Sequence, residues 1–316
     1  MTAIQNPITR SFYEHFSMPV ENNTIVPLEE IRPSVLQLVI QIEETRQRVF
    51  KLITALSNGM AEEELDFWNK HIEIEPIHAV FQTALSAATL EKLSSKEGTG
   101  DNVGASLALL SVVVDPRNKD LDELSLLGKT NPKLAIALQA LYNFRDGVMP
   151  SMLDIDIFLK DHLEECKNRP VILQIIRERK HLMALTLKLH AMIPKRILNI
   201  DFDRGVTVVW KKQRRFIAEL AEFFAQNSKK VCILEWFNYT ENMGTKLVID
   251  LSKKRFFDPY LGFYKYSSLT TCLVGLIEVA MKSYQGRFFP TKELGHTSDK
   301  IEWRFVPANF REKAKL

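Results

Sequence analysis

Cysteine is scarce in this chain, and long apolar runs are absent. The 316 residues include only Cys166, Cys232 and Cys272, and none stands in the paired CxxC spacing of a zinc site. Three scattered cysteines cannot build a disulfide framework, so we expect a reducing compartment. No eighteen apolar residues run uninterrupted, and residues 1–18 lack a basic stretch followed by an apolar one. We therefore expect neither integral membrane association nor export by a cleaved signal peptide.

The short motifs of the commoner enzyme classes are missing too. Neither GxGxxG, a P-loop, HExxH nor GxSxG occurs, and we expect no cofactor and no bound metal. The net charge is only +3, with 42 Lys+Arg against 39 Asp+Glu. Nucleic-acid binding is not expected at so balanced a charge, because phosphate contacts dominate that affinity.

Aromatic residues and charge are unevenly distributed along the chain. Residues 1–200 hold ten aromatics, whereas residues 201–316 hold twenty, which raises the preference for strands in the second part. From residue 199 onward there are 20 Lys+Arg against 13 Asp+Glu. We expect a tail at 1–34, a helical half at 35–198 and a basic sheet half at 199–316, the two halves forming one domain or two.

Apolar spacing of three and four residues predicts helices in the first half, and alternation predicts strands in the second. Ser34 is the expected N-cap of the first helix and Ser267 or Ser268 that of the last. The expected helices cover residues 35–56, 62–72, 77–93, 104–114, 121–127, 132–144, 153–166, 170–192, 213–226 and 268–284. The expected strands cover 197–202 and 206–210, joined by a turn, then 231–239, 246–251, 255–257 and 300–306. Helices followed by an antiparallel sheet define an α+β fold, with the large helical half packed on the sheet.

The second half resembles a known family. Strands 231–239, 246–251 and 255–257, the turn Asp258-Pro259-Tyr260-Leu261-Gly262 and a helix from Ser268 look like the back half of the YopT-type papain-fold effector cysteine proteases. In that family a histidine begins the middle strand, and an aspartate in an FFDPN-x-G turn orients it. Asp258 matches the aspartate, while Tyr260 stands where asparagine is usual.

The same resemblance indicates where the other two catalytic residues of the family, the histidine and the cysteine, would stand in this sequence. Residues 242–245, from Asn242 to Thr245, occupy the place of the histidine and contain none. Residues 100–107 are similar to the glycine-flanked start of the nucleophile helix, with Asn102 where cysteine would stand. A cysteine protease needs a thiolate at a helix N-terminus and an imidazole beside it. The resemblance therefore implies a papain-like scaffold that has lost the peptidase. The alternative interpretation of Asp258 is an ordinary Asp-Pro turn.

Two enzymatic alternatives remain open at the sequence level. Cys272 in the first turns of its helix and His296 before the last strand can form a dyad with Asp258 or Asp299 behind, as in a thiol hydrolase or acyl transferase. Cys272 also suits a small buried position. Asp154 and Asp156 resemble the DxD signature of metal-dependent glycosyltransferases, although acidic residues at the start of a helix are favourable in their own right.

The preferred interpretation is a non-proteolytic, effector-like protein that acts by binding a partner protein, with virulence in a host as its setting. Its expected contact surfaces are the sheet edge at 238–245, the turn at 258–263 and the basic cluster Lys211, Lys212, Arg214 and Arg215. The polar residues 1–17 suit either an uncleaved type III secretion signal or a frayed terminus. We therefore expect a cytoplasmic protein, or one secreted into a host cytosol without a cleaved signal.

Overall fold

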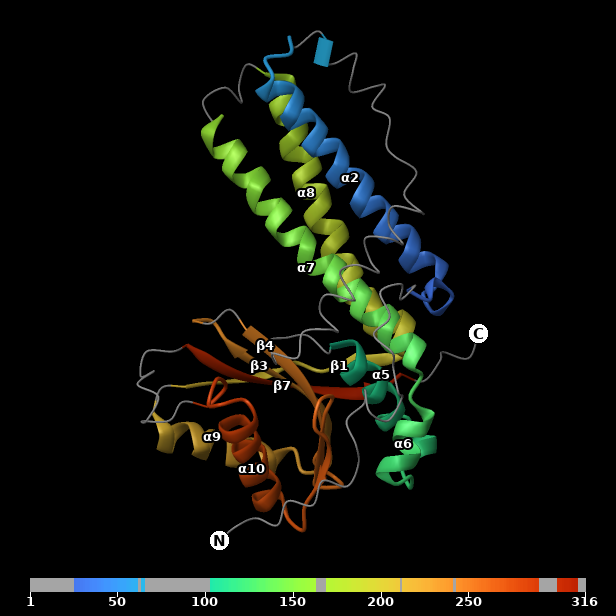
Figure 1. Ribbon diagram of the computed structural model, residues 1–316, viewed down its shortest axis with the longest axis vertical. Coiled ribbons are helices and arrows are strands. Elements are labelled where there is room, and N and C mark those ends of the chain that lie inside the picture. Colours follow the sequence, from blue (N-terminus) through green and yellow to red (C-terminus); the bar gives the residue numbers. More distant parts are fainter. Residues whose placement is uncertain are drawn as a thin grey trace. The chain divides into compact units, whose positions relative to one another are not determined.

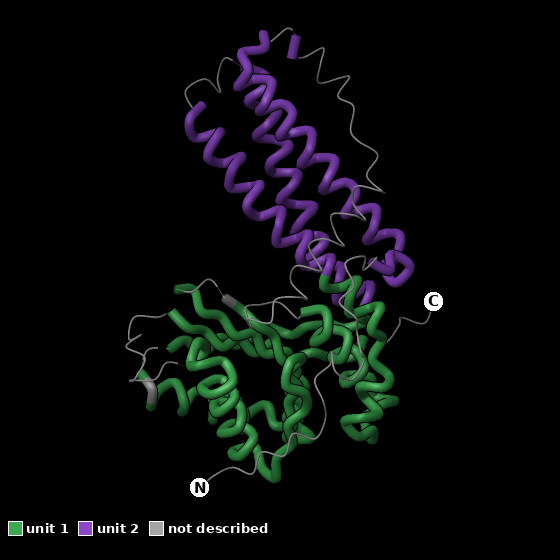
Figure 2. The backbone as a smooth tube through the Cα atoms, viewed as in Figure 1, with its two compact units in different colours: residues 1–24, 89–139, 198–316 green, residues 25–88, 140–197 purple. Residues whose placement is uncertain are grey.

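The structure is a computed structural model that describes residues 26–61, 64–65, 103–162, 169–210, 212–240, 243–289 and 300–311 (Figure 1). These residues form helices and one antiparallel sheet, so the α+β class is confirmed. They group into two compact units, coloured separately in Figure 2. The helical unit takes the described part of 25–88 and 140–197. Residues 103–139 group with residues 198–311 in the sheet unit, although the predicted division kept 35–198 together.

The helical unit contains two helices that begin at a proline, α2 (Pro33–Ser57) and α8 (Pro170–Met192). Proline suits a first helical position because its missing N–H would have no helical partner there. The range of α8 is the predicted one. The N-cap of α2 is Arg32 and makes no side-chain capping bond, so the prediction of Ser34 was wrong. Gly59, with φ of 77°, follows its C-terminus as predicted.

One long helix, α7 (Pro132–Asp161), stands where two helices at 132–144 and 153–166 were predicted. The interruption was expected at Pro150, which lies inside the helix and is exposed to solvent. A proline removes one backbone hydrogen bond, a loss that tertiary packing can outweigh. Here buried side chains hold the helix on both sides of the proline: Val148, Ser151, Met152 and Ile155.

Polar contacts join α7 to α8, which runs antiparallel to it. Arg179 donates to the Asp156 carboxylate at 2.6 and 2.9 Å, and Arg145 Nη1 lies 3.0 Å from His190 Nδ1. A π-helical turn, η4 (Ile193–Leu198), continues the chain beyond α8, and a 3-10 turn, η1 (Leu28–Glu30), precedes α2. The predicted helices at 62–72 and 77–93 lie outside the described residues, apart from helical Glu64 and Leu65.

Three short elements of the first half belong to the sheet unit: α5 (Val103–Val113), η2 (Pro116–Asn118) and α6 (Glu123–Lys129). Every residue at 103–110 is buried, as the small apolar composition predicted. Asp115 caps η2 by accepting from the Arg117 N–H, and this turn ends α5 at the predicted place. Asp122 caps α6 in the same way, accepting from the Ser125 N–H at 2.8 Å.

The described residues contain one seven-stranded sheet, whose order is β1-β7-β3-β4-β5-β6 with β2 also paired to β7. Every pairing is antiparallel. The strands are β1 (Ile200–Phe202), β2 (Val206–Val209), β3 (Val231–Asn238), β4 (Met243–Asp250), β5 (Arg255–Asp258), β6 (Gly262–Lys265) and β7 (Ile301–Phe310). The predicted turn between β1 and β2 does not make them a hairpin, because each pairs separately with β7. Strand β6 was not predicted.

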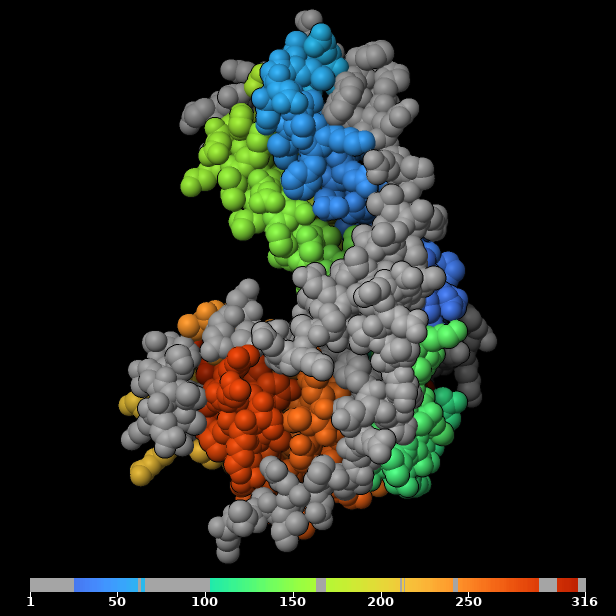
Figure 3. Space-filling view, in the orientation of Figure 1, coloured from blue at the N-terminus to red at the C-terminus, as the bar shows by residue number. Residues whose placement is uncertain are grey.

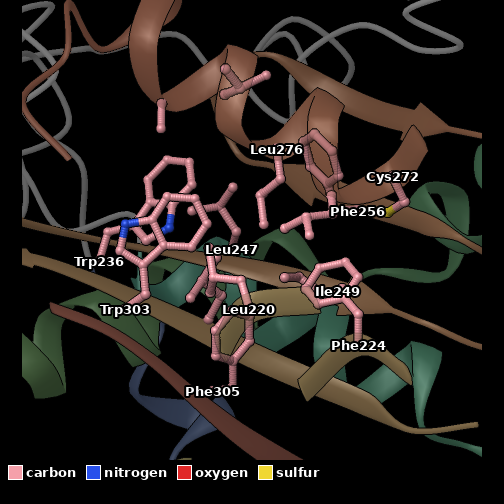
Figure 4. Close-up of a cluster of buried hydrophobic side chains, with 14 of the residues drawn as sticks. Leu220, Phe224, Trp236, Leu247, Ile249, Phe256, Cys272, Leu276, Trp303 and Phe305 are labelled. Atoms are coloured by element: carbon pink, nitrogen blue, oxygen red, sulfur yellow. The ribbon is translucent and has the colours of Figure 1, made fainter. Parts of the chain in front are cut away.

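The core of the sheet unit lies between one face of the sheet and the helices α9 (Gln213–Gln226) and α10 (Leu269–Glu278) (Figure 1). Ser268 caps α10 in a capping box with Thr271, and the π-helical turn η5 (Val279–Ser283) extends it. Most of the aromatic excess of the second half is buried here, including Trp236, Trp303, Phe224, Phe256 and Phe305 (Figure 4). Each fully buried side chain of this size contributes roughly 1.5–3 kcal/mol of transfer free energy.

The opposite face of the sheet meets α5 and α6. Ser106 Oγ on α5 donates to the Lys246 carbonyl of β4 at 2.6 Å. Buried Arg255 of β5 bonds Glu123 of α6 at 2.7 Å and Asp250 of β4 at 3.1 Å. Burial alone would raise the pKa of Glu123, but the bond and charge of Arg255 hold it below its ordinary value. Because side chains alternate along a strand, Arg255 points away from the face that carries Phe256 and Asp258.

Candidate functional site

Asp258, the residue that matches the aspartate of the protease family, ends β5 in a tight turn to β6. Its Oδ1 accepts hydrogen bonds from the N–H groups of Tyr260 at 2.8 Å and Leu261 at 3.1 Å. Gly262 then adopts φ of 94°, a conformation that favours glycine. The residues that carried the resemblance thus form a turn that the aspartate stabilises. Its carboxylate accepts from backbone N–H groups in the place of a backbone carbonyl.

The other carboxylate oxygen of Asp258 bonds a tyrosine that sequence reasoning missed. Tyr284, just after η5, donates its hydroxyl proton to Asp258 Oδ2 at 2.6 Å. Asp258 is 0% exposed, and burial raises the pKa of its carboxyl against the lowering effect of these three hydrogen bonds. Burial and the neighbouring carboxylate raise the pKa of Tyr284 well above its ordinary value. No local signal links the two residues, because they are 26 positions apart.

Two more buried polar side chains lie on the same face as Asp258 and Tyr284. Trp236 of β3 is directly opposite Thr245 of β4, and the Trp236 ring meets the Tyr284 ring edge-on, with centroids 5.5 Å apart. Trp236 Nε1 is buried without a hydrogen-bond partner in the described part of the chain, and the buried Thr245 hydroxyl lies next to that of Tyr284, whose pKa it lowers slightly against the larger raising effects. We call these four residues the Asp258 cluster. Thr245 is 2% exposed, so its side chain offers no surface to a partner protein.

The place that the resemblance gives to the nucleophile is the start of α5, and Asn102 itself lies outside the described residues, as does Asn242. From Val103 onward, α5 packs closely on its surroundings. The Gly104 N–H donates to Gln139 Oε1 at 3.0 Å, and a methyl group at Gly104 would overlap the Ala135 carbonyl of α7. Among the residues described, α5 contributes nothing to the core that surrounds the Asp258 cluster.

The two described cysteines are buried in that core. Cys272 lies in the first turn and a half of α10, as predicted, yet it is 0% exposed and sits beside Phe256 (Figure 4). Burial raises the pKa of Cys272 to about 12, and that of Cys232 to about 12 as well. A thiol of this kind carries almost no thiolate near neutral pH, so it is a poor nucleophile. His296, the other member of the predicted dyad, lies outside the described residues.

The DxD-like pair lies in the last third of α7 and not at the end of a strand. Asp154 and Asp156 are two residues apart, a spacing that points side chains to different sides of a helix. The Asp156 carboxylate forms an ion pair with Arg179 of α8. In the described ranges no three His, Cys, Asp or Glu side chains come together in a way that could hold a metal ion.

The predicted contact residues that reach the surface belong to the start of α9 and to the loops of the sheet. Lys212, Arg214 and Arg215 are exposed, and Arg215 bonds Glu219 one turn later at 2.8 Å. Lys211 lies outside the described residues, and Tyr260 is half-buried. Tyr239, which follows β3, is 52% exposed and donates to Glu302 at 3.0 Å.

Comparison with known proteins gives little further guidance. No protein-family model matches the chain, and no curated protein matches it. Among solved structures, the chain is similar to the crystal structure of the Pseudomonas avirulence protein AvrPphB. The identity is 15% and the TM-score 0.31, over 66% of this chain and 95% of that one. None of the helices that the structure describes is long and apolar enough to span a bilayer.

Proposed function

We propose that this protein acts by binding another protein, as a non-proteolytic, effector-like protein. The observation that carries the proposal is the state of Asp258, which is 0% exposed and whose two oxygens already accept three hydrogen bonds from its own turn and from Tyr284. An aspartate that orients a catalytic histidine accepts a hydrogen bond from the imidazole N–H. Asp258 accepts instead from its own turn and from Tyr284, and the histidines that the structure describes, His162, His181 and His190, belong to the helical unit.

The cysteine chemistry of the described residues supports the same proposal. A thiol nucleophile is exposed to substrate and has a lowered pKa. Cys232 and Cys272 are fully buried, and burial raises the pKa of each thiol to about 12. An acyl group could reach either sulfur only if the aromatic core around the cysteines opened.

The surface chemistry favours an acidic partner. The sheet half carries seven more basic than acidic residues, 20 against 13. At the start of α9, Lys212 and Arg214 are exposed, and each is a charge-assisted donor for a carboxylate. Exposed aromatic and arginine side chains are the residues that most often anchor protein interfaces. We therefore place the contact on Lys212, Arg214 and Arg215, with Tyr239 as the aromatic candidate.

Thiol labelling separates binding from catalysis. The native protein is treated with an alkylating thiol probe, and modification of each cysteine is followed by mass spectrometry. We expect Cys232 and Cys272 to react only after unfolding in denaturant, because their sulfurs are buried. Rapid and selective modification of native Cys272 would instead support the thiol hydrolase and end the present proposal.

The binding surface is tested by charge reversal with a matched control. Chemical cross-linking in a soluble host-cell extract is compared for the wild type and the Arg214→Glu/Arg215→Glu variant. The control variant, Arg177→Glu/Lys180→Glu, reverses two exposed charges on α8. We expect the α9 variant to lose its cross-linked acidic partner and the α8 variant to keep it. Equal recovery by both variants would show that the start of α9 is not the contact.

A further inference from the structure

Five lysines stand together at one end of the sheet. Lys229 and Lys230 come directly before β3, Lys253 and Lys254 lie in the turn from β4 to β5, and Lys265 ends β6. The antiparallel pairings bring the start of β3, the end of β4, the start of β5 and the end of β6 to the same end of the sheet. All five residues are exposed. We call them the lysine cluster.

Backbone hydrogen bonds fix the spacing of the lysine cluster. The Leu251 N–H donates to the Lys230 carbonyl at 3.0 Å, and the Lys254 N–H donates to the Leu251 carbonyl at 3.3 Å. The Tyr266 N–H then donates to the Lys254 carbonyl at 3.0 Å. Because neighbouring strands are about 4.8 Å apart, the cluster crosses four strands within about 15 Å. In the space-filling view, part of the segment from β4 to β6, coloured orange, lies at the surface (Figure 3).

Acidic side chains compensate only part of this charge. Lys230 Nζ lies 3.5 Å from Asp203, and Lys265 Nζ lies 3.5 Å from Glu123, which is preceded by the exposed Asp122. In the part of the chain that the structure describes, the other three lysines make no ion pair: Lys229, Lys253 and Lys254. These three exposed and unpaired cations carry the positive field at this end of the sheet.

Lys254 has a backbone conformation that lysine rarely adopts. Its φ is 55°, in the left-handed region, where glycine and asparagine are favoured. The turn alone would be more stable with either of those residues. A residue held in an unfavourable conformation at the surface points to a role for its side chain outside the fold. The charge of Lys254 is the property that glycine or asparagine would not supply.

We propose that the lysine cluster binds the surface of a membrane that contains anionic lipids. Lysine is a compact, strongly hydrated point charge, which suits attraction to a charged surface. Protein interfaces are depleted in lysine and enriched in arginine and aromatic residues, and the cluster consists of lysine alone. Single-stranded nucleic acids require exposed aromatic rings for stacking, whereas Tyr266, the aromatic residue beside the cluster, is 9% exposed.

The contact is electrostatic and reversible. Leu251, the apolar residue of the turn, is 1% exposed, so the turn has no apolar side chain available for insertion between lipids. A basic patch without insertion or a lipid chain attaches a protein weakly. The surface is also separate from the protein contact proposed above. Lys229 follows the C-terminal end of α9, and the 14 residues of that helix span about 20 Å from its basic start.

Cosedimentation of the full chain with vesicles tests the proposal. We expect binding to phosphatidylcholine vesicles that contain about 30% phosphatidylserine, and none to pure phosphatidylcholine. Raising the salt from about 50 mM to about 500 mM should remove most of the binding, because the contact is purely electrostatic. Each unpaired lysine should contribute about fivefold, so Lys229→Gln/Lys253→Gln/Lys254→Asn should lower the affinity about 100-fold.

Two controls accompany the triple variant. Asparagine adopts the left-handed conformation readily, so the variant should stay folded, which circular dichroism checks. The matched control, Arg177→Gln/Lys180→Gln/Lys188→Gln, removes three exposed charges on α8 and should bind vesicles like the wild type.

Three vesicle results would each overturn the proposal: no binding to anionic vesicles at low salt, a lysine-cluster variant that binds like the wild type, or an equal loss in the α8 control. A fourth contrary result is an acidic protein that the wild type cross-links in a cell extract and the lysine-cluster variant does not, with no vesicle binding by either. That result would assign the cluster to a protein partner. Because none of these variants changes the start of α9, failure here leaves the proposed protein contact to its own test.

Discussion

Replacing Tyr284 with phenylalanine removes the hydroxyl that donates to Asp258 Oδ2 and leaves the ring in place. The ring contacts with Trp236 and Phe288 remain, so the change isolates one hydrogen bond of the Asp258 cluster. Asp258 is 0% exposed, and water therefore cannot replace the lost donor without opening the core.

The expected cost follows from the charge on the acceptor. A hydrogen bond to an ionised group contributes about 1.5–3 kcal/mol, and one between neutral groups about 1 kcal/mol. We expect Tyr284→Phe to lower the free energy of unfolding by roughly 1.5–3 kcal/mol where Asp258 is ionised. Where Asp258 is protonated, the cost should fall to about 1 kcal/mol.

The pH dependence has a definite sign. Burial raises the pKa of folded Asp258 above its unfolded value, so the native state binds more protons than the unfolded state between those two values. The contribution of Asp258 to stability is fully present below the unfolded pKa and is lost as pH rises through the folded pKa. Its slope cannot exceed about 1.4 kcal/mol per pH unit for one proton. Tyr284→Phe raises the pKa of folded Asp258 further, because the bond from Tyr284 lowers it. The loss of unfolding free energy caused by the substitution therefore grows with pH.

Urea unfolding followed by tryptophan fluorescence measures this cost, because buried Trp236 belongs to the Asp258 cluster and buried Trp303 packs against it. The titration should be repeated from about pH 4.5 to about pH 8. The matched control is Tyr239→Phe, which removes a tyrosine-to-carboxylate bond at a residue 52% exposed and should cost less than about 0.5 kcal/mol. Equal costs for the two variants, or a Tyr284→Phe cost independent of pH, would refute the reasoning.

Two further stability predictions rest on the sheet unit and α7. Arg255→Met leaves Asp250 buried without a cation and Glu123 with only the half-exposed Lys265 at 3.5 Å, and should cost about 3–5 kcal/mol in urea unfolding. Arg311→Met breaks an exposed pair with Asp201 and should cost less than about 1 kcal/mol; equal losses would contradict the argument. Gly275→Ala would force a methyl group into the Tyr266 hydroxyl and should lower the melting temperature through a loss of about 1–3 kcal/mol. The control variant Gly147→Ala meets no atom within 4 Å and should raise the free energy of unfolding by about 0.5–1 kcal/mol. A Gly275→Ala variant more stable than the wild type would contradict the argument.

Helices with strong local signals were predictable from the sequence. The ranges of α8 and α9 were predicted to the residue, because periodic apolar positions coincide with a proline start in one and a basic start in the other. The uninterrupted α7 was not predicted, since the packing that holds Pro150 inside the helix is tertiary. The pairing of β1 and β2 with β7 joins residues about a hundred positions apart, and no local turn chemistry encodes that choice.

The features of the candidate site were likewise predictable where local sequence sets them and not where tertiary packing does. The turn at Asp258 could be read from Asp-Pro and Gly262, because those residues shape the local backbone. Its burial and its bond to Tyr284 come from the packing of η5 against the sheet, which sequence spacing does not reveal. The placement of Cys272 at the start of α10 was predictable. Its burial depends on the core that it shares with Ile249 of β4 and Phe256 of β5 (Figure 4).

The position of β7 has a consequence for how the protein is made. Residues 301–310 are the last strand described, yet they join β1 and β2 to β3. On the ribosome, β3 to β6 can assemble among themselves, but β1 and β2 have no neighbour until these residues emerge. Long-range strand pairing of this kind is slow and leaves open edges exposed. The sheet therefore cannot be completed before residues 301–310 have been synthesised, and until then β1 and β2 lack the strand with which they pair.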